Sequence, residues 1–352
     1  MRVLVAMSGG VDSSVAAALL ASAGHDAVGA TMKLWGGKSD TGCCSVGDVD
    51  DARRVAQQLG IAHHVFNFSD DFDRHVVEPY VSDHAAGRTP NPCVECNRHL
   101  KFDRLLARAT QLGFDAVATG HHARVVRAVG GGWSLCRGAD PDKDQSYVLH
   151  MLNQRQLARV MLPVGHMTKA EVRLTAASLR LRTAAKPDSQ DVCFISRAAG
   201  REAFLGERIT LRPARVVDRA GAVIGTVPAV ELVTVGQRRG FGALSEPGGS
   251  AGDAGGRRYA IAVDVAAATV TVGSLSDLLV SEVRVVAPVW VDQPPAPAEP
   301  LHAQVSAHGR PVAATWSADG RVVLAEPIRR VAPGQSVVLY RGDAVVGGGP
   351  AG

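Results

Sequence analysis

Residues 8–14 read Ser-Gly-Gly-Val-Asp-Ser-Ser and directly follow the apolar run Val3–Met7. Adjacent glycines let a backbone approach an anion closely, and the first N–H groups of a following helix bind phosphate. The serine hydroxyls add donors, and Asp12 beside a phosphate site predicts a bridging Mg2+. The string has neither the lysine of a Walker A loop nor the GxGxxG of a dinucleotide fold. We therefore predict a phosphate-binding loop, with a plain glycine-rich turn as the alternative.

Six cysteines supply a second kind of chemistry. Cys93 and Cys96 form a CxxC pair in a predicted loop before a helix, and a helix N-terminus lowers the pKa of a thiol, which favours a thiolate at Cys96. Cys193 lies at the mouth of a predicted strand. Structural zinc commonly needs two such pairs, so we favour a redox or sulfur-carrying pair, and an iron–sulfur cluster on three thiolates stays open. No chemical role is expected for Cys43, Cys44 and Cys136.

Strands and helices are predicted to alternate in the first half of the chain. The predicted strands are Val3–Met7, Ala27–Leu34, His64–Phe68 and Asp115–Thr119, and the predicted helices are Ser13–Ala23, Asp50–Leu59, Phe72–Ala85 and Arg98–Gln111. Such alternation is typical of a parallel sheet with helices on both faces. A helix is also predicted over Gln154–Val160, and the capping-box spacing from Thr168 to Glu171 opens another that runs to about Leu181.

The second half is predicted to be rich in β-structure. Turn residues at 219–221, 318–320 and 342–343 each separate two runs of strand-forming residues, as hairpin turns do. No long helix is predicted from Ala260 onward. Two connections are expected to be irregular: a mobile glycine-rich loop over 245–258 and an exposed proline-rich segment over Gln293–Pro300.

A chain of 352 residues is too long for one ordinary core, so several domains are expected. The predicted fold class is α/β, with an N-terminal doubly wound parallel sheet, a small central β-rich domain and a C-terminal β-barrel. We place the domains at residues 1–200, 201–275 and 276–352.

Composition narrows the functional classes. No apolar run reaches the ~18 residues that span a bilayer, and the N-terminus turns to glycine too soon for a secretory signal, so we predict a cytoplasmic protein without a membrane partner. In such a chain six cysteines do not indicate a disulfide scaffold. A net charge of +4 permits nucleic-acid binding without requiring it.

Several strings together resemble one enzyme family. The loop at 8–14 resembles that of N-type ATP pyrophosphatases, which cleave ATP between the α and β phosphates and adenylate an oxygen. Four further strings resemble the tRNA-specific 2-thiouridylases: GRTPNPCVECN at 87–97, ATGH at 118–121, KDQSY at 143–147 and DSQDVCFI at 188–195. Weaker matches lie at 235–240 and 331–335, so the resemblance covers nearly the whole chain.

The resemblance implies a tRNA-uridine 2-sulfurtransferase reaction. ATP adenylates the C2 oxygen of wobble uridine 34, and sulfur then replaces that oxygen. The implied catalytic residues are Cys193, which carries a persulfide, and Cys96, which attacks the persulfide or acts as a base. The pair ends in a disulfide that a reductant resets. The implied partners are tRNAs for lysine, glutamate and glutamine, and a sulfur-relay protein that loads Cys193.

The resemblance also assigns binding residues, position by position. The residues expected at ATP with its Mg2+ are Ala6, Met7, Ser8, Gly9, Gly10, Val11, Asp12, Ser13, Met32 and Gly120. The residues expected at the tRNA are Asn91, Pro92, Cys93, His121, Lys143, Asp144, Gln145 and Gln335. A base in an anticodon loop can be turned into such a pocket at modest cost.

Three departures from the family pattern matter. Many relatives have Asp where this chain has Cys93, so the resemblance leaves open a [4Fe-4S] cluster on Cys93, Cys96 and Cys193 in place of the persulfide. The glycine-rich loop after Gly242 is expanded. An Arg-Tyr pair of some relatives is absent near 302–310, which leaves part of the expected tRNA contact without support.

Two other functions are compatible with parts of the pattern. A phosphate loop of this type also occurs in synthetases that adenylate a small metabolite, although the three thiols argue against that function. A non-catalytic iron–sulfur or RNA-binding protein would not need the intact phosphate loop.

Overall fold

The N-terminal part of the chain forms a five-stranded parallel sheet with strand order β3-β2-β1-β4-β7. The computed structural model describes residues 1–34, 45–188, 192–195, 200–241 and 257–352. The five strands are β1 Arg2–Ala6, β2 Asp26–Lys33, β3 His63–Asn67, β4 Ala116–Ala118 and β7 Val160–Met161. In β1, Val3, Leu4 and Val5 are fully buried, because a parallel sheet is covered on both faces.

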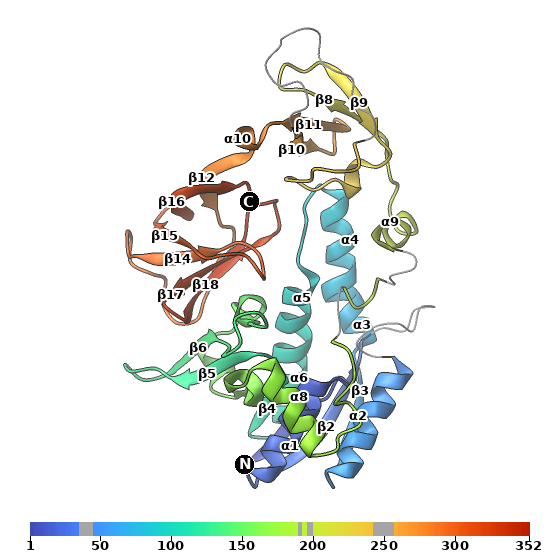
Figure 1. Cartoon of the computed structure of the whole chain (residues 1–352), viewed down its shortest axis with the longest axis vertical. Coiled ribbons are helices and arrows are strands. Elements are labelled where there is room, and N and C mark those ends of the chain that lie inside the picture. The colour runs from blue at the N-terminus through green and yellow to red at the C-terminus, as the bar shows by residue number, and fades with distance from the viewer. Residues whose placement is uncertain (35–44, 189–191, 196–199, 242–256) are drawn as a thin grey trace.

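Helices cover both faces of this sheet, so the predicted doubly wound α/β fold is confirmed (Figure 1). On one face, an apolar cluster packs α1 Val11–Ser22, α2 Val46–Gln58 and α8 Lys169–Ser178 against the sheet. On the other face, a second cluster packs two longer helical segments, Ser69–Ala85 and Pro92–Gln111.

Both longer segments contain a stretch of π-helix. The first consists of α3 Ser69–Phe72, the π-helical η1 Asp73–Val77 and α4 Glu78–Ala85, and the second of α5 Pro92–Glu95, the π-helical η2 Cys96–Arg104 and α6 Leu105–Gln111. The second segment begins earlier than predicted. The Asn91 side chain caps it by accepting from the Cys93 N–H at 3.1 Å, and Pro92 provides its first residue.

The start of that helix corrects the prediction for the CxxC pair. Cys93 lies in the first turn of the helix, and Cys96 lies one turn further in, where it is buried. The pair is therefore part of the helix and not of a loop before it. Cys93, and not Cys96, therefore lies at the helix N-terminus, where the helix dipole stabilises negative charge.

Several short helical elements follow β4. They are the 3-10 helix η3 Ser146–Leu149, α7 Gln154–Leu157 and the 3-10 helix η4 Pro163–His166. The predicted helix over Gln154–Val160 stops at Leu157, because Val160 joins the parallel sheet as the first residue of β7. The predicted capping box is confirmed: the Thr168 side chain accepts from the Glu171 N–H, and Glu171 accepts from the Thr168 N–H at 2.7 Å. The helix that it opens, α8, ends at Ser178 instead of about Leu181.

A second, four-stranded sheet has the order β10-β11-β8-β9. Its strands are β8 Ala214–Val217, β9 Val223–Val227, β10 Tyr259–Asp264 and β11 Thr269–Gly273, with α9 Gly200–Gly206 and the 3-10 helix η5 Val230–Leu232 beside them. The predicted turn at 219–221 joins β8 to β9. Helix α4 extends from the parallel sheet to this central sheet (Figure 1).

Seven C-terminal strands belong to a nine-stranded sheet. They are β12 Leu279–Arg284, β13 Val289–Trp290, β14 Leu301–Gln304, β15 Val312–Ser317, β16 Arg321–Arg329, β17 Ser336–Arg341 and β18 Ala344–Pro350, and the short α10 Leu275–Leu278 precedes them. The predicted turns at 318–320 and 342–343 join β15 to β16 and β17 to β18. The proline-rich segment at 293–300 connects β13 to β14 and is mostly exposed.

One feature of this sheet was not predicted. The hairpin of β5 Ala123–Arg127 and β6 Trp133–Arg137, which belongs to the first half of the chain, extends the C-terminal sheet beyond β18. Ala344 pairs with Cys136, and the Arg137 N–H donates to the Asp343 carbonyl at 3.0 Å. Cys136 is thus a buried residue of a strand that pairs with the C-terminal sheet.

Some predictions fall outside the described residues. Cys43, Cys44 and most of the glycine-rich loop at 245–258 are among them. Across the part of the chain that the structure describes, the helices are too short or too polar to cross a bilayer.

Two buried histidines lie where the other sheets meet the N-terminal part. His84 of α4 hydrogen-bonds to the backbone at Glu231 of η5, and His150 lies beside Gly348 of β18 and 2.8 Å from the Tyr147 carbonyl. Burial lowers the pKa of both rings from 6.5 to about 4, so both are neutral in the folded chain at neutral pH.

We predict that acid weakens the fold through these two rings. Between pH 6.5 and about 4 an unfolded chain binds protons on both histidines and the folded chain does not, so the free energy of unfolding falls as the pH falls. Urea unfolding at pH 7 and pH 5 measures this slope. A double variant His84→Gln/His150→Gln should show a shallower slope, and the exposed His308→Gln should not. Equal slopes in all three chains would contradict the assignment.

Candidate nucleotide and sulfur-transfer site

The loop between β1 and α1 has the shape that its sequence predicts. Gly9 has a φ of +72°, and a Cβ at this position would lie 2.3 Å from the Asp48 carbonyl oxygen, so only glycine fits. The hydroxyls of Ser13 and Ser14 donate to the Gly10 carbonyl at 3.1 and 2.8 Å. These two serines therefore hold the loop closed, while Ser8 remains exposed.

The loop lies at the point where the strand order of the parallel sheet reverses. β1 is flanked by β2 and β4, and ligands of such sheets bind at the carboxyl ends of the strands on either side of this point. Gly120 follows β4 and packs on the loop: a Cβ there would lie 2.6 Å from both the Asp12 carbonyl carbon and the Ser13 nitrogen. Met32, near the end of β2, is buried nearby in the second apolar cluster. The structure thus gathers Gly10, Gly120 and Met32 at one edge of the sheet.

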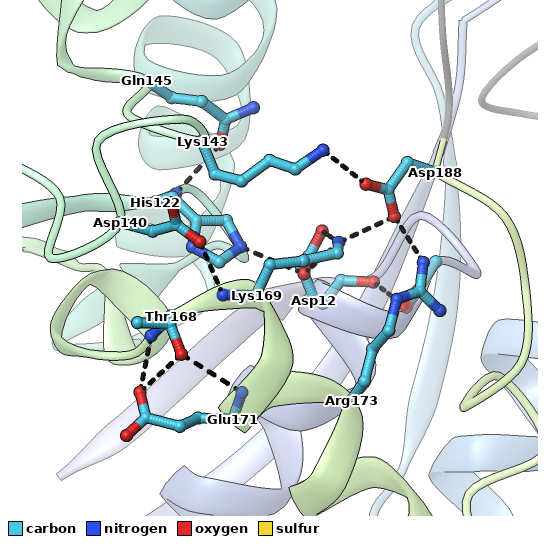
Figure 2. Close-up of polar contacts among 12 residues, drawn as sticks. Asp12, His122, Asp140, Lys143, Gln145, Thr168, Lys169, Glu171, Arg173 and Asp188 are labelled. Atoms are coloured by element: carbon cyan, nitrogen blue, oxygen red, sulfur yellow. Dashed lines mark hydrogen bonds and ion pairs between the residues drawn. The ribbon is translucent and has the colours of Figure 1, made fainter.

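Asp12 is the centre of a polar cluster at this edge (Figure 2). Both of its carboxylate oxygens lie 2.7 Å from the Lys169 ammonium, and His122 Nε2 lies 3.1 Å from Oδ1. Burial by itself raises the pKa of Asp12, but the hydrogen bonds from His122 and Lys169 outweigh it and lower the pKa below its ordinary value. Asp12 is therefore ionised at neutral pH.

A second carboxylate, Asp188, extends the cluster. It accepts from Lys143 at 3.0 Å, from Lys169 at 2.9 Å and from Arg173 at 2.7 Å. Burial raises the pKa of Asp188, yet the lysine ammonium groups lower it to about 2. Lys169 thus joins the phosphate loop to the residue that precedes the Cys193 segment.

The sequence analysis missed Lys169, Arg173 and His122. A signal for the first two was present, because they lie four residues apart in the helix that the capping box opens, and such residues share one face. The rings of the adjacent residues His121 and His122 face different partners: His122 faces Asp12, and His121 faces Thr119 and Lys101.

His121 is fully buried and uncharged. Its Nδ1 lies 2.7 Å from the Thr119 hydroxyl, and its Nε2 lies 3.4 Å from the Lys101 ammonium. Burial and the Lys101 charge lower its pKa well below 6.5. An uncharged ring with Nε2 free of a proton can accept from Lys101, so His121 positions that cation.

The three neighbours Lys143, Asp144 and Gln145 face different ways. Lys143 is bonded to Asp188, and Gln145 pairs with the backbone of His122 through its side-chain oxygen and its N–H, both at 2.9 Å. The Asp144 carboxylate is buried, where it accepts from the Ser146 N–H and the Arg137 guanidinium, both at 3.0 Å. Asp144 therefore connects the segment 143–146 to the hairpin formed by β5 and β6.

Gln335 also contacts the chain itself. Its amide donates to the Thr89 carbonyl at 2.7 Å, and the Thr89 N–H donates to the Pro333 carbonyl at the same distance. These bonds hold the segment that leads to Asn91 and the CxxC helix against the C-terminal sheet. The tRNA roles expected for Gln335 and Asn91 remain predictions.

Cys96 and Cys193 both pack on the second apolar cluster. Cys96 is a member of the second apolar cluster, and Cys193 packs against the same cluster from a distant part of the sequence. Phe194 anchors the Cys193 segment there, because its buried ring packs edge-on against Phe72 at 5.6 Å and Tyr80 at 5.4 Å between centroids. Ala6 and Met32, at the carboxyl ends of β1 and β2, belong to this cluster too.

The three thiols do not fit a cluster site in this arrangement. Cys93 is exposed, Cys96 is buried and Cys193 is half-buried. Among the described residues, no three cysteine, histidine or carboxylate side chains come together in a way that could hold a metal ion. We therefore derive no chemical step through an iron–sulfur cluster.

Comparisons with known proteins agree with the fold. A model of the tRNA methyl transferase HUP domain matches residues 1–197, and a model of the aminomethyltransferase beta-barrel domain matches residues 280–351. The curated relatives include tRNA-specific 2-thiouridylases from Chloroflexus aggregans, 48% identical, and from Cutibacterium acnes, 44% identical. Their alignments cover 99% of this chain and 97% and 95% of the relatives.

Solved structures are more distant. A U34-tRNA thiolase from Methanococcus maripaludis, described with its [4Fe-4S] cluster, has a TM-score of 0.37 and 18% identity, covering 59% of this chain and 63% of that chain. A 4-thiouridine synthetase in complex with RNA and ATP has the same TM-score and 17% identity, covering 55% of this chain and 44% of that chain. Neither similarity supports an inference about a cluster or a ligand in this chain.

A HUP domain with a phosphate loop, joined to a C-terminal β-barrel domain, defines the class as an ATP-using RNA-modification enzyme. The full-length identity is more specific. The chain belongs to the MnmA family of tRNA-specific 2-thiouridylases. This membership favours RNA thiolation over the two alternatives, a synthetase of small metabolites and a non-catalytic protein.

We predict that Gly120→Ala weakens ATP binding at least about tenfold, because the added Cβ displaces the backbone at Asp12 and Ser13. Titration calorimetry with ATP and Mg2+ measures the effect. Gly130→Ala is the matched control, since nothing lies within 4 Å of a Cβ there. Wild-type affinity in Gly120→Ala would show that the loop does not hold the nucleotide.

Proposed function

We propose that this chain replaces the C2 oxygen of the wobble uridine in tRNA with sulfur after adenylating that oxygen. The observation that carries the proposal is the shared position of Cys96 and Cys193 on the apolar cluster that also contains Ala6 and Met32, next to the phosphate loop. Activation and sulfur transfer need this proximity, because both act on the two atoms of one carbonyl group.

The first step uses the edge of the sheet. The uridine O2 attacks the α-phosphorus of ATP, the bond from that phosphorus to the bridging oxygen breaks, and pyrophosphate leaves with the electron pair. Gly9, Gly10 and the first N–H groups of α1 hold the phosphates. Mg2+, when bound, neutralises phosphate charge, and the Asp12 carboxylate offers the oxygen ligands that this ion prefers.

The second step uses the cysteines. The terminal sulfur of a persulfide on Cys193 attacks C2, and the Cys96 thiolate attacks the Cys193 sulfur. The sulfur–sulfur bond of the persulfide then breaks toward C2, the C2–O bond breaks, and AMP leaves with its electron pair. A Cys96–Cys193 disulfide remains, and a dithiol reductant restores both thiols. His121 would hold Lys101 in place for this step, since Lys101 comes from the same π-helix as Cys96.

The tRNA-facing groups belong to the same proposal. Asn91, Pro92 and Cys93 at the start of the CxxC helix would contact the target base, and the loop with Lys143 and Gln145 would face the tRNA backbone. Asp144 and Gln335 would act indirectly on tRNA binding, because their hydrogen bonds with Arg137 and Thr89 position the neighbouring segments.

Partners and location are proposed from the family resemblance. We infer tRNAs for lysine, glutamate and glutamine as substrates and a sulfur-relay protein, either a cysteine desulfurase or a carrier, as the donor. The site of action is the cytoplasm.

We predict that Cys193→Ser abolishes 2-thiouridine in tRNA while ATP binding is retained, because the persulfide carrier is lost and the phosphate loop is untouched. Mass spectrometry of tRNA nucleosides from a strain that carries only the variant measures the product. Cys136→Ser is the matched control, because Cys136 lies in the β6 strand away from the phosphate loop and should leave the product in place. Normal 2-thiouridine with Cys193→Ser would refute the carrier role.

A further inference from the structure

Three cationic side chains converge on a single carboxylate beside the phosphate loop (Figure 2). Lys143, Lys169 and Arg173 lie 3.0, 2.9 and 2.7 Å from the oxygens of Asp188. One carboxylate neutralises only one of these charges. Even when Asp12 is counted as the second partner of Lys169, the three cations outnumber the two carboxylates.

This group is continuous with the proposed nucleotide site. The Lys169 ammonium touches Asp12, which lies in the first turn of α1, directly after the glycines of the loop. The Lys169 side chain is 12% exposed and the Asp188 side chain 25% exposed, so water screens their interaction only in part. Phosphates on the loop would therefore lie within reach of the same cations.

The cations are held from two sides. Lys169 and Arg173 come from one face of α8, and Lys143 comes from the segment that leads to η3. Arg173 is also fixed by the carbonyl oxygens of Ala184 and Lys186, which it reaches at 2.9 and 3.0 Å. Their positions thus do not depend on Asp188 alone.

We propose that Lys143, Lys169 and Arg173 form the receiving site for the pyrophosphate that leaves during adenylation, and that the Asp188 carboxylate competes with pyrophosphate for these three cations. The proposal rests on the adenylation step proposed above. In this proposal the Asp188 carboxylate binds the three cations when pyrophosphate is absent, and pyrophosphate displaces the carboxylate when it is formed.

Charge and geometry favour this exchange. Pyrophosphate offers more acceptor oxygens and more negative charge than a carboxylate, so it can bond to the three cations at the same time. Once pyrophosphate has left, Asp188 recovers the cations, which limits how long the product stays bound. A competing carboxylate of this kind lowers product affinity and speeds product release.

The test is a direct titration of the full chain with sodium pyrophosphate at fixed ionic strength, without tRNA or ATP. Removing the competitor should tighten binding, so Asp188→Asn should bind pyrophosphate at least about tenfold more tightly than the wild type. Lys169→Met and Arg173→Met should bind it about tenfold more weakly, because each loses a charge-assisted hydrogen bond to the anion.

Asp140→Asn is the matched control. Its carboxylate lies in the same cluster but accepts from the backbone N–H groups of Lys169 and Asp142, not from the cationic side chains (Figure 2). A change of less than about twofold in this variant shows that competition, and not the general charge of the region, sets the affinity.

Equal or weaker pyrophosphate binding by Asp188→Asn, or an equal gain in Asp140→Asn, overturns the proposal. Asp188→Ala and circular dichroism guard against a folding defect in the first variant. The outcome is separable from the proposed function, since a chain that still makes 2-thiouridine but shows no gain in Asp188→Asn refutes only the pyrophosphate site.

Discussion

The ammonium group of Lys169 holds two distant parts of the site together. It contacts Asp12 in the phosphate loop and Asp188 ahead of the Cys193 segment, at 2.7 and 2.9 Å. A cation shared by two partly buried carboxylates offsets a repulsion that would otherwise separate them. The edge of the sheet that is proposed to bind a nucleotide is thereby connected to the segment ahead of Cys193, the proposed sulfur carrier.

Polar contacts help to join the C-terminal sheet to this site, beside the strand pairing of β6 with β18. Asp144 binds Arg137, whose guanidinium lies 3.8 Å from the centre of the Tyr340 ring, and Gln335 binds the Thr89 carbonyl. Both contacts connect the C-terminal sheet to segments near the cysteines. Two residues that the family resemblance places at the tRNA, Asp144 and Gln335, therefore also help to hold the C-terminal sheet against the N-terminal part of the chain.

The sequence predicted most of the fold because its signals are local. The alternation of strands and helices, the capping box at Thr168 and the three hairpin turns each depend on a few neighbouring residues, and the structure confirms them. Two of the errors in the predicted helix bounds have different causes, one local and one long-range. The early start of the CxxC helix depends on the cap from Asn91, and the end of the helix after Leu157 depends on the strand pairing of Val160.

The site was predicted only in part for the same reason. The loop predicted to bind phosphate is contiguous in sequence, and the resemblance pointed to Cys96 and Cys193, which both pack on one apolar cluster. The spacing of Lys169 and Arg173 is a local signal that they share one helix face, but it does not reveal their carboxylate partners Asp12 and Asp188, which lie elsewhere in the chain. The pairing of β6 with β18 is likewise a long-range contact without a local signature.

The most direct test of this account is a double-mutant cycle between Asp12→Asn and Lys169→Met, with the free energy of unfolding measured in urea. If the Lys169 ammonium joins the loop to α8, the two changes should be coupled by at least about 1 kcal/mol. Additive effects, within about 0.5 kcal/mol, would show that the contact does not hold the site together.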